Sequence, residues 1–600
     1  MDSPRLYHKL PFPDSIRLLE LSQDEMKDSI CGHLVLSRLK DTPCFAALSY
    51  VWGCASSEDP ILKVDGFELK IRQSLKHALD ALFYGSNKIL LWIDQICIDQ
   101  ENYIERQFQV TLMSKIFRQA QRVICWLGLD DENTKIAFDL STVLAIEGFD
   151  LESWKEPMQR LVEAGFISDI SDLVNPARVP LSALAWLVKK TWFGRLWTVQ
   201  EVALASKLEF RCGGSTIDGD IFFAAIRRIS SSVHNPPAPL VLEPFRHAIR
   251  LGQLRAQIAD TISCSYPHLA HTFSTWGCTK NEDRLNALFG LAFPYNCDST
   301  WFQPRYDLTG PELYIKFAKD YIKETGNLDI LHFSGCGDSE KYSLYYIGGI
   351  PVLEPSPPAD DVPSWVPDWR VQSRPLVLLS DPGYDVKSHF TATLSKVDYF
   401  FDENEHKLHV RALLVDEIVA CGYPYYLSLC RDLQITEHGI FEQWYELAKD
   451  HLNSDTFENM FSSTLVMDAR MILTERGALN VNQDEIPTLF KYWQKMMTAD
   501  SLFYDPDEAL QLIEGSARYG YVAEEVCRNR AMFITKRGRL GLGSTHVSPG
   551  AHIYLLHGLK TPFVVFKTSQ GHILRGECYV NGLMDQQVHT SESDIYIDLI

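Results

Sequence analysis

Residues 89–100 read ILLWIDQICIDQ, an apolar run that stops abruptly at a polar pair. The opening residues, 89–93, have the length and composition of a buried strand, and Asp94 and Gln95 end it. The stretch that follows, residues 103–120, repeats apolar side chains every four positions, which is typical of an amphipathic helix. A buried strand followed by a helix predicts a βα unit, with polar residues standing where the strand ends.

The same alternation continues on both sides of this unit. Short apolar runs at residues 45–51 (FAALSYV), 123–127 (VICWL) and 208–212 predict further strands, and Gly128 closes the second of these runs. Residues 74–84 place apolar side chains at helical spacing between two of the strands. Strands separated by helices predict βαβ units and a largely parallel sheet, so we expect an α/β fold here.

Beyond the first strands and helices the pattern changes twice. Residues 216–350 are mainly helical in pattern, whereas residues 370–600 contain short β-rich runs punctuated by glycine, with helical insertions. A proline-rich, acidic segment at residues 351–369 separates these regions and is typical of a linker. We therefore predict four parts: residues 1–215, a helical middle region, the linker and a β-rich C-terminal region.

The composition is that of a folded protein. The chain has 600 residues, of which 46% are hydrophobic and 12% aromatic, and this is enough apolar surface for several cores. Its formal net charge is −21, from 57 basic and 78 acidic residues. A chain this acidic lacks the basic footprint of a general phosphate-backbone binder, so we expect no nucleic-acid partner.

Sequence features of membrane, secreted and metal-binding proteins are missing. The most apolar stretches, such as residues 181–188, are far shorter than the ~20 residues that span a bilayer, and residues 1–15 contain no apolar signal segment. The 14 cysteines include no C-x-x-C pair, and the 18 histidines show no metal-ligand spacing. We predict a cytoplasmic protein with reduced thiols, no membrane segment, no metal and no tightly held cofactor.

Signatures of several common enzyme classes are also absent. The sequence has no phosphate-binding P-loop, no G-x-G-x-x-G turn, no H-E-x-x-H zinc motif and no G-x-S-x-G nucleophile elbow. Dense blocks of aromatic and polar residues stand out instead. They are ALSYVWG at residues 47–53, LWIDQICIDQ at residues 91–100 and WFGRLWTVQE at residues 192–201.

In this order and spacing, the blocks closely resemble the fungal heterokaryon-incompatibility (HET) domain. The sequence departs from the family pattern at Phe45, where a tyrosine is usual, and at Asp99, where asparagine is commoner. Further along the chain, EDRLNALFGLA at residues 282–292 and PSWVPDW at residues 363–369 resemble blocks found in full-length proteins of this type. The resemblance covers most of the chain, although the named domain corresponds to its first third.

The resemblance implies a role in fungal nonself recognition, in which association of HET domains triggers growth arrest or programmed cell death. The HET domain is itself distantly similar to the TIR fold, a doubly wound, mostly parallel sheet that acts as a signalling adaptor or as an NAD-cleaving enzyme. In enzymatic TIR domains the catalytic glutamate follows a tryptophan, and Glu201 follows Trp197 here. The resemblance thus implies a protein partner or self-association, with NAD as a candidate substrate.

The candidate site residues stand where the predicted strands end and in the third block. In doubly wound sheets, ligands bind beyond the carboxyl ends of the strands. Glu201 is the candidate catalytic carboxylate for a glycosidic cleavage, which needs an acidic group to stabilise an oxocarbenium-like centre or to orient ribose hydroxyls. The candidate ligand-binding residues are Ser49, Tyr50, Trp52, Asp94, Gln95, Arg106, Arg195 and Trp197.

Structural roles for the same residues are the alternative. Asp94 and Asp99 flank a predicted helix start and are suited to capping its backbone N–H groups. Arg195 is suited to stacking on a neighbouring tryptophan, and Glu105 to a buried salt bridge with the first block. The functional alternatives to a signalling adaptor are an NAD-hydrolysing enzyme that uses Glu201, a scaffold without chemistry, and a HET-like scaffold recruited as a small-molecule biosynthetic enzyme.

Overall fold

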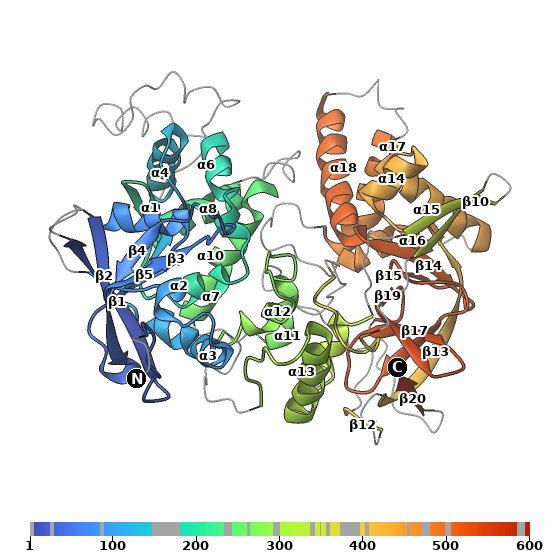
Figure 1. Cartoon of the computed structure of the whole chain (residues 1–600). Helices are drawn as coiled ribbons and strands as arrows, with labels where there is room; N and C mark the ends of the chain where they lie inside the picture. Colours follow the sequence, from blue (N-terminus) through green and yellow to red (C-terminus); the bar gives the residue numbers. More distant parts are fainter. Residues whose placement is uncertain are drawn as a thin grey trace. The chain divides into compact units, whose positions relative to one another are not determined.

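The computed structural model divides into two units, each with its own core (Figure 1). Unit 1 contains residues 1–269 and 276–307, and unit 2 contains residues 270–275 and 308–600. The boundaries that the sequence predicts between four parts stay predictions, and residues 356–360 of the predicted linker lie outside the described residues. The structure describes residues 5–24, 29–83, 89–146, 181–232, 243–260, 265–291, 301–335, 342–347, 350–355, 361–371, 396–402, 407–452, 457–469, 481–497, 506–584 and 594–600.

Unit 1 is built on a nine-stranded sheet with the order β5-β4-β2-β1-β6-β3-β7-β8-β9. Its central strands β6, β3, β7 and β8 run parallel, which confirms the predicted α/β class. Antiparallel pairs flank them, with the β1–β2 and β4–β5 hairpins on one side and β9 on the other. The strands are β1 (Ser15–Asp24), β2 (Ser29–Arg38), β3 (Ala46–Tyr50), β4 (Ile61–Val64), β5 (Phe67–Lys70), β6 (Leu90–Trp92), β7 (Arg122–Trp126), β8 (Leu208–Cys212) and β9 (Ser215–Asp218).

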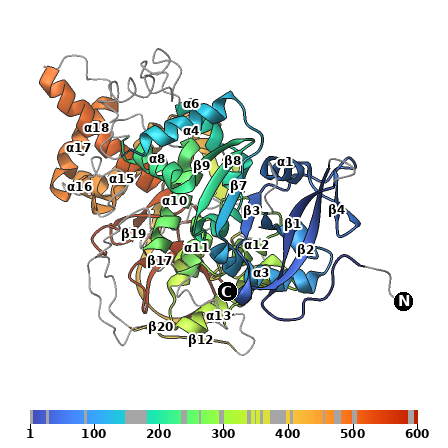
Figure 2. The ribbon, with the colours of Figure 1, turned by 90° about the vertical axis from the view of Figure 1, so that its left-hand side faces the viewer.

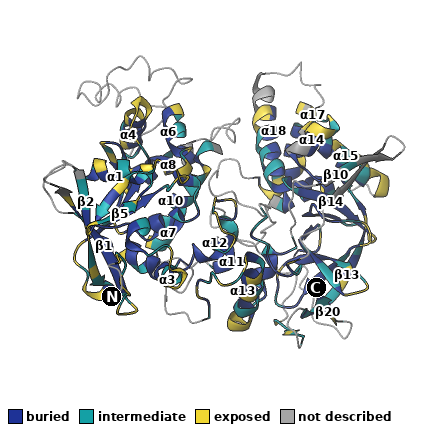
Figure 3. Cartoon of the chain, in the orientation of Figure 1, coloured by how far each residue is buried: buried dark blue, intermediate teal, exposed yellow. Residues whose placement is uncertain are grey.

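Helices connect these strands and pack on one another. Helix α10 packs against α7 and α8, and α8 in turn packs against α4 and strand β8 (Figure 2). Figure 3 shows buried residues along the strands and exposed residues on the outer side of α4. The helices of this part of the chain are α1 (Gln73–Leu82), α2 (Asp94–Cys97), α3 (Tyr103–Gln119), α4 (Glu132–Leu144), α6 (Leu181–Val188), α7 (Thr198–Ala203), α8 (Gly219–Ser232), α10 (Arg246–Ala259), α11 (Tyr266–Thr272) and α12 (Asp283–Asn286).

The order of the parallel strands creates a switch point at β3. The chain passes from β3 to β6 on one side and then crosses to β7 on the other side. This is the order of doubly wound sheets, whose ligand site is the crevice beside the reversal, at the carboxyl ends of the strands. Ser49 lies next to the last residue of β3 and is a buried polar side chain, with 1% of its surface exposed. The topology therefore places the first sequence block at the position where such sheets bind ligands.

A closed ring of strands forms the β-rich part of unit 2. Strand β13 pairs with both β16 and β20, and the pairs β16–β17, β17–β18 and β18–β20 complete the ring. The far end of β13 leaves the ring and pairs with β14, which continues into β15 and β19. The strands are β13 (Leu408–Cys421), β14 (Arg530–Thr535), β15 (Leu540–Ser544), β16 (His552–Leu556), β17 (Pro562–Lys567), β18 (His572–Glu577), β19 (Tyr579–Val580) and β20 (Ile595–Leu599).

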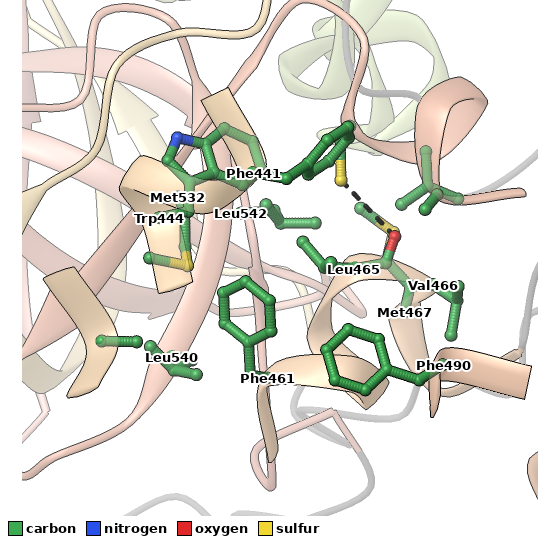
Figure 4. Packing of buried hydrophobic residues seen from close by; sticks show 14 of the residues in the cluster. Phe441, Trp444, Phe461, Leu465, Val466, Met467, Phe490, Met532, Leu540 and Leu542 are labelled. Carbon is green, nitrogen blue, oxygen red and sulfur yellow. Dashed lines mark hydrogen bonds between the residues drawn. The ribbon is translucent and has the colours of Figure 1, made fainter. Parts of the chain in front are cut away.

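Helices inserted between β13 and β14 build a second core on the β14–β15–β19 extension. Phe461 and Phe490 of these helices belong to one buried cluster with Leu540 and Leu542 of β15, and Figure 4 shows part of it. Among the described residues, no helix has the length and apolarity needed to cross a membrane. The remaining elements of unit 2 are α13 (Gly310–Thr325), β10 (Tyr342–Ile347), β11 (Ile350–Pro355), β12 (Tyr399–Phe401), α14 (Leu427–Leu433), α15 (Glu437–His451), α16 (Phe457–Leu465), α17 (Ile486–Met497) and α18 (Pro506–Cys527).

Candidate functional site

Trp192, Ser49 and Glu201 form a hydrogen-bonded chain at the carboxyl end of β3. The indole Nε1 of Trp192 donates to Ser49 Oγ at 2.8 Å, and the Ser49 hydroxyl donates in turn to Glu201 Oε2. Because an indole N–H is only a donor, the serine oxygen accepts there and directs its own hydrogen to the carboxylate. Glu201 is 6% exposed. The candidate catalytic carboxyl is therefore held by a side-chain hydroxyl whose direction the tryptophan fixes.

Separate elements bring these side chains together. Strand β3 supplies Ser49, the short 3-10 turn Thr191–Gly194 supplies Trp192, and helix α7 supplies Glu201. The Trp192 ring meets Phe210 of β8 edge-on, with ring centroids 5.5 Å apart. Edge-to-face packing of this kind fixes the plane of an aromatic ring. The apolar core beneath the sheet thus sets the direction of the indole N–H that Ser49 accepts.

A second set of contacts joins the ends of β3 and β6. The indole Nε1 of Trp52 donates to Asp94 Oδ2 at 3.0 Å, and the backbone N–H of Gln95 donates to Asp94 Oδ1 at 2.7 Å. The Tyr50 hydroxyl donates to Gln95 Oε1 at 2.9 Å. Asp94 thus accepts from the N–H of the next residue in α2 without acting as its cap, since α2 has no side-chain cap hydrogen bond, and it also accepts from an aromatic side chain of the first block.

Arg195 lies between these two sets. Its guanidinium donates to the main-chain oxygen of Tyr50, so it is bonded to the end of β3. Its positive charge also lowers the pKa of both Asp94 and Glu201, which places both carboxyls within its electrostatic reach. The predicted site residues Ser49, Tyr50, Trp52, Asp94, Gln95, Arg195 and Glu201 therefore gather at one edge of the sheet.

Burial dominates the electrostatics of the two carboxyls. Loss of hydration raises the pKa of Glu201 to about 7, because it outweighs the opposing effects of Arg195 and of the Ser49 hydrogen bond. Burial likewise raises the pKa of Asp94 to about 6, against Arg195 and the hydrogen bonds from Gln95 and Trp52. Near neutral pH, both the protonated and the ionised form of Glu201 are therefore populated, which is a property shared by many acid–base groups.

Arg106 and Trp197 contact a different group of residues. The Arg106 guanidinium lies 5.4 Å from the centroid of the Tyr306 ring, and Trp197 Nε1 donates to Asp283 Oδ2 at 3.3 Å. The Tyr306 hydroxyl donates to Asp283 Oδ1 at 2.8 Å. Sequence reasoning missed Asp283 and Tyr306 as neighbours of the site. The signal that could have found Asp283 is the EDRLNALFGLA block, which begins one residue before it.

Glu105 makes the buried ion pair that the sequence suggests, but with a different partner. Its Oε2 accepts from Arg17 of β1 at 3.0 Å, and 9% of the Glu105 side chain and 5% of the Arg17 side chain are exposed. The expected partner was the first block, on β3. Strand β1 pairs directly with β6 and so lies nearer to the start of α3, where Glu105 stands. The ion pair therefore fastens the N-terminal hairpin to α3.

The geometry supports two kinds of role for this site. A carboxyl that titrates near neutral pH, beside a hydroxyl, a guanidinium and tryptophan rings, has the groups that stabilise a cationic sugar centre or move a proton. The same contacts also tie together the ends of two parallel strands and a short helix. The catalytic and ligand-binding roles of these residues stay predictions.

Comparison with known proteins identifies two regions of the chain. Residues 45–201 match the family described as heterokaryon incompatibility protein (HET). The HET match begins one residue before β3 and ends at Glu201, so it includes the carboxyl that pairs with Ser49. Residues 508–597 match the Het-6 beta-barrel domain, and this range includes most of the strands in the closed ring of unit 2.

A curated relative resembles the chain along nearly its whole length. The Neurospora crassa protein named heterokaryon incompatibility protein 6, OR allele, is 23% identical over 676 aligned positions, which cover 97% of this chain and 96% of the relative. No solved structure shows significant similarity to the chain. The two matched regions and this relative support a HET-domain heterokaryon incompatibility protein. The similarity of the N-terminal region to TIR domains stays a prediction.

Proposed function

We propose that this protein acts in fungal nonself recognition, with its HET region as the part that arrests growth or triggers cell death when HET regions associate. The observation that carries the proposal is the presence of a HET region and a Het-6 barrel region on one chain that aligns end to end with a heterokaryon incompatibility protein. In this proposal the protein is cytoplasmic, and unit 2 senses a protein partner or restrains unit 1.

The structure supports unit 1 as the effector. The whole HET match lies in it, and so do the residues that gather around Glu201. A strand order of the doubly wound kind is consistent with the TIR-like fold that the sequence blocks imply. An effector that is complete within one unit can be separated from the region that restrains it.

Expression in a fungal host tests this proposal. Residues 1–307, driven from an inducible promoter, are expected to arrest colony growth more strongly than the full chain at matched protein levels. Circular dichroism of the purified fragment establishes that it is folded. A folded fragment that leaves growth unchanged would contradict the proposal that unit 1 is the effector.

A second candidate function is hydrolysis of NAD to nicotinamide and ADP-ribose. The observation that favours it is the Glu201 carboxyl, whose pKa of about 7 and hydrogen bond to Ser49 place a titratable acid at the switch point of the sheet. In such a reaction water replaces nicotinamide at the ribose carbon, and a carboxylate stabilises the cationic centre that forms as the glycosidic bond breaks.

Release of nicotinamide from NAD by the purified protein tests this second function. Turnover that falls at least about a hundredfold in Glu201→Gln would support it, because removal of a catalytic acid or base commonly costs that much. Growth arrest without turnover, or turnover that persists in Glu201→Gln, would leave the adaptor function and remove the enzymatic one.

A further inference from the structure

The EDRLNALFGLA block has no role in the site described above, yet it reaches the helix that carries Glu201. Asp283 of this block is 7% exposed and accepts a 3.3 Å hydrogen bond from the indole of Trp197. Trp197 is the N-cap residue immediately before α7, and its own side chain does not cap the helix. Asp283 therefore anchors the start of the helix in which Glu201 stands.

A backbone contact joins the same two segments. The N–H of Gly277 donates to the carbonyl of Gly194 at 2.7 Å, and the N–H of Leu196 donates to the carbonyl of Gly277 at 2.9 Å. These bonds form a one-residue parallel bridge between Gly277 and Arg195. Arg195, whose charge lowers the pKa of both Asp94 and Glu201, is thus held by a segment that lies outside the HET match.

The anchoring segment is itself fixed on several sides. Arg284 donates to the main-chain oxygen of Trp276, which closes the loop that leads from Gly277 to Asp283. The side chain of Asn286 both donates to the carbonyl of Arg305, at 2.8 Å, and accepts from its N–H, at 3.2 Å. This exchange positions the neighbouring Tyr306, whose hydroxyl donates to Asp283. Residues 276–286 therefore form a rigid support.

We propose that Asp283 is a positioning residue for Glu201, and that residues 276–286 belong to the functional HET unit although they lie beyond the region that matches the family. A helix as short as α7, with six residues, has little stability of its own, so its direction depends on what its ends contact. Trp197 and Arg195 make such contacts just before α7, and the helix also packs against α10 and α3. The consequence for growth arrest rests on the proposed role of the Glu201 site.

Loss of Asp283 changes the environment of Glu201 in a definite direction. Release of Trp197 lets the start of α7 move, which loosens the bond between Ser49 and Glu201 and admits water to the carboxyl. Because burial is what raises the pKa of Glu201, hydration lowers it toward the ordinary value of 4.5. Among the described residues, the titratable groups that interact with Glu201 are Arg195, Asp94 and the buried thiol of Cys125 on β7, and all three are retained in the variant.

The indole N–H groups of the full chain report this change directly. A ¹⁵N-tryptophan TROSY spectrum resolves the indole N–H signals. The signals that disappear in Trp192→Phe and in Trp197→Phe are those of Trp192 and Trp197. The Trp192 signal senses Glu201 through Ser49 and is expected to titrate with a midpoint of about 7. In Asp283→Ala we expect this midpoint to fall by about one pH unit, because the carboxyl regains water.

Further variants separate positioning from loss of fold. Asp283→Asn keeps an oxygen that accepts from Trp197 and is expected to retain the Trp192 midpoint, whereas Trp197→Phe is expected to lower it as Asp283→Ala does. Asp329→Ala is the matched control, because Asp329 also accepts from a tyrosine hydroxyl, at 3.1 Å from Tyr321, but lies in unit 2. It is expected to leave the Trp192 signal unchanged.

An unchanged Trp192 midpoint in folded Asp283→Ala, or in Trp197→Phe if the first variant does not fold, would overturn the proposal. The growth assay answers a separate question. If full-length Glu201→Gln still arrests growth as the unaltered chain does, the proposed role of the Glu201 site fails, whereas the spectra still decide whether Asp283 positions α7.

Discussion

Three buried carboxyls of unit 1 accept hydrogen bonds from neutral donors, unlike the ion-paired Glu105 of the same unit, whereas two buried carboxyls of unit 2 lie against imidazoles. Glu201 accepts from a serine hydroxyl, Asp94 from a tryptophan and a backbone N–H, and Asp283 from a tryptophan and a tyrosine. Burial raises the pKa of Glu201 to about 7 and the pKa values of Asp94 and Asp283 to about 6. These contacts leave each carboxyl free to hold or release a proton near neutral pH.

Two buried carboxyls of unit 2 lie instead against imidazoles. Oε2 of Glu577, on β18, lies 2.6 Å from Nδ1 of His332 and also accepts from the Thr561 hydroxyl. The Glu577 side chain is fully buried. Asp594 lies 3.0 Å from Nε2 of His557. An imidazole can carry the compensating charge or the shared proton, so such pairs fasten one element to another. The difference indicates chemistry or regulation in unit 1 and a structural role for the paired groups of unit 2.

The largest expected effect concerns how much of the chain unit 1 needs in order to fold. A fragment of residues 1–215 lacks α8, α10 and the support for α7, whereas residues 1–307 retain them. We expect cooperative thermal unfolding for the longer fragment and none for the shorter one, measured by circular dichroism. Two equally cooperative transitions would show that the site of unit 1 is stable without residues 216–307.

Removal of His332 tests the structural role of the imidazole pairs. His332→Ala leaves Glu577 buried without its imidazole partner, and breaking a buried pair in this way costs about 3–5 kcal/mol. Urea denaturation of the full chain measures the effect on the unit 2 transition. His33→Ala is the control, because the His33 side chain is 64% exposed and exposed pairs contribute at most about 1 kcal/mol. Equal effects in the two variants would contradict the distinction between units.

The pH dependence of unit 1 stability gives a smaller effect. The unfolded chain ionises Glu201 near 4.5 and the folded chain near 7, so the folded state binds more protons and its stability falls as pH rises between these values. The shift corresponds to roughly 3 kcal/mol. Glu201→Gln removes this loss. In urea titrations, the free energy of unfolding of the variant is therefore expected to rise relative to that of the unaltered protein as the pH increases from 4.5 to 8.

Glu312→Gln is the control for the sign of this effect. The backbone N–H of Thr309 holds the pKa of Glu312 below its usual value. Replacement of this carboxyl by an amide is therefore expected to lower the free energy of unfolding above pH 5 and to change it little at lower pH. A Glu201→Gln variant whose stability follows the unaltered protein at every pH would show that Glu201 is hydrated in the folded state.

Sequence patterns predict the central sheet well because β3 and β7 are buried on both faces and β8 is apolar at every buried position. The apolar runs at residues 45–51, 89–93, 123–127 and 208–212 become β3, β6, β7 and β8: the first two strands are two residues shorter, β7 begins one residue earlier, and β8 has the predicted bounds. The long hairpin β1–β2 was not predicted. Its first strand carries Arg17, a residue type that indicates an exposed position, and the structure buries it by pairing it with Glu105. Such a partner is distant in sequence and leaves no local pattern.

The candidate site shows the same limit. Polar residues at strand ends predict a site at the carboxyl edge, and Ser49, Asp94 and Glu201 do lie there. In the structure the Ser49 hydroxyl donates to Glu201, because Trp192 donates to the serine oxygen and so directs its hydrogen. The sequence around Trp192 predicts only a core position for this tryptophan, so it does not reveal this contact. Asp283 could not be placed from spacing, because the chain returns to α7 only after the helices between residues 219 and 272.

The long strand β13 has a consequence for the order of events during synthesis. It pairs with β16 and with β20, so the ring of unit 2 closes only when the chain has been made as far as residue 599. Unit 1 is complete at residue 307. At about 5–20 residues per second, the ribosome needs roughly 15–60 s to add the rest. Each new molecule therefore contains a complete unit 1 for that interval before the ring of unit 2 can close.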